Sequence, residues 1–121
     1  MFYLRVEGDF ASAHQLREYK GKCENLHGHN WQVMVRVRGE KLDSLGMLMD
    51  FGDLKKLLKQ SMDYLDHKFL NETAPFDAIN PTSENLAKFL YEELGRGLPS
   101  GVEVHDVTVW ESEKCAATYS R

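Results

Sequence analysis

Hydrophobic residues change their spacing twice along the chain, and this change restricts the possible folds more than any other feature. Strand patterns, mostly with every second residue apolar, occupy four segments: 2–14, 29–38, 102–111 and 115–119. Between them, apolar residues recur at helical spacing from Asp50 to Leu65, and again after Asn80-Pro81-Thr82-Ser83. This order predicts one α+β domain over residues 1–121, a four-stranded antiparallel sheet with two helices on one face.

Charge and hydropathy argue against several classes of protein. The formal net charge of −4, from 15 Lys and Arg against 19 Asp and Glu, disfavours a general nucleic-acid binder. Two local groups of basic residues are exceptions to this acidic balance. The first consists of Arg17, Lys20 and Lys22, and the second of Arg36 and Arg38. No apolar run approaches the roughly 18 residues of a membrane span. Residues 1–10 lack the basic start and apolar core of a signal peptide, so we expect a soluble, cytoplasmic protein.

Three histidines are the first candidates for chemistry. His27 and His29 are two residues apart, so in an extended chain they share a face, about 6.6 Å apart at the backbone. His14 ends the first predicted strand on its apolar face, and a single loop joins the two strands. If the strands pair, all three rings meet at one end of the sheet. Three histidines with an open fourth position are typical of catalytic zinc, although cobalt, nickel, ferrous iron or an ordinary polar strand end remain alternatives.

Other candidates lie near the histidines in the sequence or share a face with the core. Cys23, four residues before His27, is either a metal-activated thiolate or a fourth metal ligand. Asp66 beside His67 places a carboxylate next to an imidazole that can exchange protons. Glu111 shares parity with Val107 and Val109, so it points either inward, where it needs hydrogen-bond donors, or into solvent.

Five short motifs, in order, resemble one known family over nearly the whole chain. They are Phe10-Ala11-Ser12-Ala13-His14, Cys23-Glu24-Asn25-Leu26-His27-Gly28-His29, Leu65-Asp66-His67, Asn80-Pro81-Thr82-Ser83-Glu84-Asn85 and Trp110-Glu111. The family is that of the 6-pyruvoyltetrahydropterin and 6-carboxytetrahydropterin synthases. The resemblance implies the tunnelling fold, trimers whose sheets close into a barrel, commonly stacked as hexamers, and 7,8-dihydroneopterin triphosphate as substrate.

The resemblance also implies a role for each matching residue. His14, His27 and His29 match the zinc ligands, Cys23 the general base, and His67 with Asp66 the second proton-transfer group. Glu111 matches the carboxylate that anchors the pterin. Glu24 and Thr82 are further candidates for substrate binding. On this reading, replacing Glu111 by glutamine should weaken pterin binding far more than zinc binding.

The branch of the family depends on residues 23 and 24. A cysteine four residues before the first histidine of the His-Gly-His segment resembles the 6-carboxytetrahydropterin synthases of queuosine biosynthesis, which release acetaldehyde and triphosphate. The pyruvoyl enzymes of the mammalian type have a longer spacing. Glu24 resembles a third branch, in which glutamate replaces the cysteine and 6-hydroxymethyl-dihydropterin is formed for folate. We expect Glu24 to be idle, with a second activity as the alternative. An alternative from a different functional class is a zinc- or pterin-binding protein without catalytic turnover, in which Cys23 is a ligand of the metal.

Overall fold

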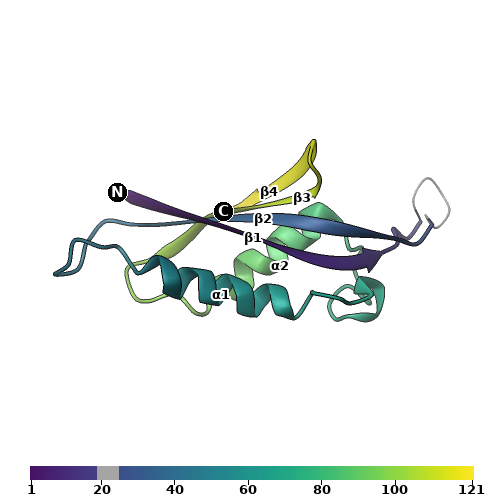
Figure 1. The fold of residues 1–121 in the computed structure, drawn as a ribbon, viewed down its shortest axis with the longest axis horizontal. Coiled ribbons are helices and arrows are strands. Elements are labelled where there is room, and N and C mark those ends of the chain that lie inside the picture. Colours follow the sequence, from purple (N-terminus) through teal and green to yellow (C-terminus); the bar gives the residue numbers. More distant parts are fainter. Residues whose placement is uncertain (19–24) are drawn as a thin grey trace.

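The predicted order of strands and helices is confirmed. The computed structural model describes residues 1–18 and 25–121, without the side chain of His27. Its elements are β1 (Phe2–His14), β2 (His27–Gly39), α1 (Phe51–Asp63), a 3-10 turn (Leu70–Glu72), α2 (Ser83–Gly95), β3 (Glu103–Ser112) and β4 (Cys115–Ser120). Both helices lie on the same side of the sheet (Figure 1). The second strand begins two residues earlier than predicted, at His27, because its pairing with β1 continues to that residue.

The sheet has the order β1-β2-β3-β4, with every neighbouring pair antiparallel. β1 and β2 pair from Phe2 opposite Gly39 to His14 opposite His27. This register has no slip, so the last residue of β1 meets the first residue of β2. The three histidine positions of the sequence therefore gather at one end of the sheet, which is the end where β3 reaches Glu111.

The hydrophobic core lies between the sheet and the two helices. The alternation in β1 and β2 buries one face of each strand, and the helices contribute apolar residues at helical spacing. The core has these buried members: Val6, Phe10, Trp31, Val33, Val35, Val37, Leu54, Leu58, Met62, Leu65, Leu70, Phe76, Leu86, Ala87, Leu90, Leu94, Val104, Val107 and Val109. Because Trp31 is completely buried beside His14 and His29, the end of the sheet that carries these histidines is also part of the core.

Both helices begin at side-chain caps that are visible in the sequence. Asp50 accepts hydrogen bonds from the backbone N–H groups of Gly52 and Asp53, and Thr82 accepts one from Asn85. Helix α1 crosses β1 closely at Gly8, where an added Cβ would lie 2.6 Å from Cε of Met62. In the described part of the chain, no helix is long and apolar enough to cross a membrane.

The opposite face of the sheet is polar. There the two arginines of the second basic group form ion pairs with acidic residues of β3. Arg36 donates from Nε to Asp106 Oδ1 at 2.9 Å, and Arg38 donates from Nε to Glu103 Oε1 at 2.7 Å. The guanidinium of Arg36 holds the pKa of the buried Asp106 carboxyl below its usual value. These two arginines therefore balance acidic neighbours on β3.

Candidate functional site

Three side chains from three strands meet at the end of the sheet. Nε2 of His14 lies 3.3 Å from Oε1 of Glu111, and Nε2 of His29 lies 3.1 Å from the same oxygen. His14, His29 and Glu111 each offer one possible ligand atom, and these three atoms all lie within 4.8 Å of one another. His14 is 1% exposed, and Glu111 is 37% exposed. The site thus combines a buried floor with a side that solvent can reach.

The ring of His14 is held by a residue distant in the sequence. Its Nδ1 lies 2.8 Å from the carbonyl oxygen of Pro81, which precedes the cap of α2. Because a carbonyl oxygen only accepts hydrogen bonds, Nδ1 carries the proton and Nε2 is the nitrogen directed to Glu111. The rings of His29 and Trp31 pack edge-on against this imidazole, each with centroids 4.9 Å away. A hydrogen-bonded second nitrogen is the usual arrangement of a metal-binding histidine.

The structure describes some of the expected site residues and leaves others outside. The backbone of His27 pairs with His14, but its side chain, Cys23 and Glu24 lie outside the described residues. Thr82 is the cap of α2, and its hydroxyl accepts the N–H of Asn85 at 3.1 Å. The hydroxyl therefore has a local structural role.

Asp66 and His67 lie against the outer edge of β1. Oδ1 of Asp66 accepts the N–H of Ala11 at 2.9 Å, and the N–H of His67 donates to the carbonyl of Ala11 at 2.5 Å. The other carboxylate oxygen lies 3.0 Å from Nδ1 of His67, whose ring is 82% exposed. This pairing holds the short segment in place, with a left-handed φ of 54° at His67. Asp66 thus orients the imidazole of His67 beside the last residues of β1.

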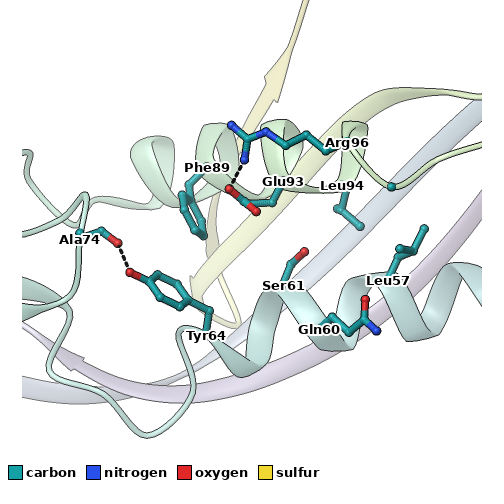
Figure 2. Close-up of a pocket in the computed structure, with 10 residues that line it drawn as sticks. Leu57, Gln60, Ser61, Tyr64, Ala74, Phe89, Glu93, Leu94 and Arg96 are labelled. Carbon is teal, nitrogen blue, oxygen red and sulfur yellow. Dashed lines mark hydrogen bonds and ion pairs between the residues drawn. The ribbon is translucent and has the colours of Figure 1, made fainter.

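A shallow cavity borders His67 beside β1 and β2. It has a volume of about 470 Å³ and is lined by Ala11, Ser12, Ala13, Gly28, His29, Asn30, His67 and Lys68. The lining includes His67 and one residue of the cluster, His29, whereas His14 and Glu111 are not part of it. A different depression of about 460 Å³ lies between α1 and α2 (Figure 2), where Tyr64 stacks on Phe89 and Glu93 pairs with Arg96. Of the expected catalytic residues that the structure describes, none lines that depression.

Arg17, which belongs to the first basic group of the sequence, has a structural role. Its guanidinium donates to the carbonyl oxygens of Asn71, Phe76 and Ile79 at 3.1, 2.6 and 3.0 Å. Asn80 completes the attachment, since its side chain accepts from the N–H of Arg17 and donates to its carbonyl. These bonds fasten the chain just after His14 to the segment before α2. Hydrophobic periodicity contains no signal for them, because the partners are more than 50 residues apart.

Asp66 leads to a prediction about acid stability. The N–H of Ala11, with a contribution from His67, holds the pKa of the Asp66 carboxyl below its ordinary 3.8. A lowered pKa stabilises the folded protein above the unfolded value, and this stabilisation is lost as pH falls through the folded pKa. We expect Asp66→Asn to lower the melting temperature at pH 7, with the difference from wild type shrinking below about pH 4.

Thermal unfolding followed from about pH 7 to about pH 3 measures this difference. Asp63→Asn is the matched control. Asp63 lies three residues before Asp66, is exposed, and forms an ion pair with Lys59. Its removal should have a small effect that salt screens. A difference between wild type and Asp66→Asn that is the same at every pH would contradict the role assigned to the ionised carboxylate.

Sequence comparisons agree with the geometry. A family model described as 6-pyruvoyl tetrahydropterin synthase matches residues 3–121. Human 6-pyruvoyl tetrahydrobiopterin synthase is 37% identical over 119 residues, which cover 95% of this chain and 81% of the human protein. The 6-carboxy-5,6,7,8-tetrahydropterin synthase of Synechocystis is 36% identical in an alignment 125 positions long, which covers 98% of this chain and 93% of that protein.

Comparison of folds points the same way. The structure of Caenorhabditis elegans 6-pyruvoyl tetrahydropterin synthase matches with a TM-score of 0.85 and 32% identity, covering 99% of this chain and 95% of that one. Its agreement extends over both helices and the whole sheet, so the shared architecture is the tunnelling fold. The chain therefore belongs to the 6-pyruvoyl tetrahydropterin synthase family, as the five motifs of its sequence predict.

Proposed function

We propose that this chain is a zinc-dependent 6-carboxy-5,6,7,8-tetrahydropterin synthase. It converts 7,8-dihydroneopterin triphosphate to 6-carboxytetrahydropterin, releases acetaldehyde and triphosphate, and acts in the cytoplasm in queuosine biosynthesis. The observation that carries the proposal is the cluster of His14, His29 and Glu111, whose ligand atoms all lie within 4.8 Å of one another. A group of side chains able to hold a metal ion thus lies in a member of a pterin synthase family.

The donor set fits zinc. Two imidazole nitrogens and a carboxylate oxygen are common zinc ligands, and the Nδ1–H of His14 is already taken by Pro81. His27 is proposed as the third histidine ligand, because its backbone pairs with His14. Zinc bound here would polarise the side-chain oxygens of the substrate and make the neighbouring C–H bonds more acidic.

Proton transfer is assigned to two groups. Cys23 is proposed as the base from its place in the sequence motif, since a thiol starts near pKa 8.5 and needs only modest lowering to ionise. His67 is proposed as the second group. Asp66 keeps its charge at neutral pH and holds Nδ1 of His67, which leaves Nε2 of the ring as the nitrogen that exchanges a proton with substrate.

Substrate binding is assigned to Glu111 and Thr82. The amino-pyrimidine edge of a pterin presents two N–H donors, and a carboxylate accepts both in a charge-assisted pair. The Thr82 hydroxyl accepts from Asn85 and keeps its own hydrogen to donate to the substrate. Glu24 is the remaining candidate for substrate binding, on sequence alone.

The alternatives differ in product. Relatives of this chain carry the names of both a 6-carboxytetrahydropterin synthase and a 6-pyruvoyl tetrahydrobiopterin synthase. A folate-type or bifunctional enzyme would form 6-hydroxymethyl-dihydropterin through Glu24. We favour the carboxy product because Cys23 lies only four residues before His27.

Product analysis tests the choice. Purified, zinc-loaded protein is incubated with 7,8-dihydroneopterin triphosphate, and the pterins are identified by mass spectrometry. We expect 6-carboxytetrahydropterin together with an equal amount of acetaldehyde. Formation of 6-pyruvoyltetrahydropterin or 6-hydroxymethyl-dihydropterin as the main product would replace our proposal with the corresponding alternative. No turnover with zinc bound would favour a non-catalytic zinc or pterin protein.

Self-assembly is proposed from the edges of the sheet. β1 and β4 are its outer strands. Among the described residues, the segment around His67 covers part of the β1 edge through hydrogen bonds to Ala11 and Ala13. Edges of this kind are stabilised when they pair with another strand, and closing a barrel removes them. We expect light scattering to give a mass of three or six chains of 13.9 kDa. A stable, active monomer at low micromolar concentration would contradict this expectation.

A further inference from the structure

We propose that Glu111 is itself a ligand of the metal in the substrate-free protein, and that substrate displaces it. The inference rests on the proposed zinc site and adds a fourth ligand to the three histidines. It assigns the same carboxylate two successive partners, first the metal ion and then the N–H groups of the pterin. The exchange is a ligand substitution, in which a bond from the metal to Glu111 breaks and one to a substrate oxygen forms, with no redox change.

The first argument is the protonation of His14. Pro81 fixes the proton on Nδ1, so in the neutral ring Nε2 carries a lone pair. This lone pair is directed at Oε1 of Glu111, another lone-pair atom, 3.3 Å away. An imidazole nitrogen and a carboxylate oxygen held this close by separate strands can bind one metal ion together. Because His14 is 1% exposed and is held by Pro81, its side of the site is already fixed.

The second argument is the spacing of the atoms. Ligands bound about 2.0–2.1 Å from a tetrahedral zinc ion lie about 3.3 Å from one another. The distances from Oε1 of Glu111 to the two histidine nitrogens are 3.3 and 3.1 Å. Charge-assisted hydrogen bonds between a nitrogen cation and a carboxylate are shorter, about 2.7–2.9 Å. Both separations therefore match those of ligands on one ion, and the three ligand atoms all lie within 4.8 Å of one another.

The third argument is the backbone at Glu111. The pairing of β3 with β4 changes register between Trp110 and Ser112, so Glu111 has no directly opposed residue on β4. Irregularities of this kind redirect a side chain and are frequent beside active sites. Because the Glu111 side chain is 37% exposed, it can leave the ion without disturbing the core. The strand thus places the carboxylate on the metal and allows it to move away.

The decisive measurement is metal affinity without substrate. Zinc is titrated into wild-type, Glu111→Gln and Glu111→Asp proteins in competition with a chromogenic chelator, and the visible spectra of the cobalt-loaded proteins are recorded. Glutamine keeps the shape of the side chain but removes its charge. The sequence by itself predicts that Glu111→Gln affects zinc binding much less than pterin binding, whereas a metal-bound carboxylate predicts that zinc affinity falls at least about tenfold, the lower limit seen when even an outer-shell partner is lost. The cobalt bands should shift as water replaces the carboxylate. Aspartate keeps the charge on a shorter side chain and should restore part of the affinity.

Glu113→Gln is the matched control, because Glu113 is exposed in the same hairpin two residues later. It should bind zinc like wild type, and circular dichroism checks that every variant is folded. If Glu111→Gln binds zinc as tightly as wild type with an unchanged cobalt spectrum but loses turnover, Glu111 anchors only the pterin; the inference is then wrong and the proposed function stands. If wild-type protein binds no metal, the zinc enzyme itself is the wrong proposal.

Discussion

Replacing Cys23 by alanine is expected to abolish formation of 6-carboxytetrahydropterin while zinc remains bound. A positioned acid or base contributes about two to four orders of magnitude to a rate, so the turnover number should fall by at least about a hundredfold. A thiolate is the better base at this position, because glutamate starts from a pKa of about 4.3 and would need strong burial to accept a proton at neutral pH. Steady-state kinetics with metal analysis of the same sample measures both quantities.

Two variants control this experiment. Cys115→Ala removes the other cysteine, which is exposed on β4, and should leave activity intact. Glu24→Ala should leave the carboxy product nearly intact and remove only a 6-hydroxymethyl-dihydropterin side product. If Glu24→Ala stops formation of the carboxy product while Cys23→Ala does not, the folate-type branch is the better interpretation. Loss of zinc from Cys23→Ala would instead make the cysteine a structural ligand.

Replacing His14 by alanine is expected to remove both the metal and the activity. Loss of an outer-shell partner already weakens metal binding by about 10–100-fold, so loss of a ligand should weaken it by more than 100-fold. His14 also orders its surroundings, since it joins the carbonyl of Pro81 to the rings of Trp31 and His29. Metal content by atomic emission after gel filtration, together with turnover, tests the prediction.

His105→Ala is the matched control for the histidine variants. His105 is a half-buried histidine near the start of β3, edge-on to Tyr3 with ring centroids 5.0 Å apart, whereas Glu111 lies near the other end of the strand. Its removal should leave zinc bound. Because His14 is buried in the core, His29→Ala is measured as well, since His29 is 22% exposed and its loss disturbs packing less. Undiminished zinc in the His14, His27 and His29 variants would mean that the ligand set is wrong.

The helices and strands could be predicted because the signals that determine them are local. Alternation in residues 2–14 and 29–38 places Phe10 and Trp31 on a buried face, and the caps at Asp50 and Thr82 act within three residues. Family membership was predictable for a similar reason, since it depends on the order of short motifs. The convergence of His14 with the His27–His29 segment also followed, because one loop joins two paired strands.

Tertiary structure decided what those residues contact. The carbonyl of Pro81, 67 positions from His14, determines which nitrogen of the His14 ring is protonated. Asp66 accepts a hydrogen bond from the backbone N–H of Ala11, 55 positions away. Glu111 comes close to both histidines because β3 pairs with β2 in a register that brings its last residues to the same end of the sheet. Sequence periodicity determines which face of an element is buried, through the hydrophobic effect. Contacts between distant polar atoms depend instead on strand register and helix position, which are set when the whole core packs.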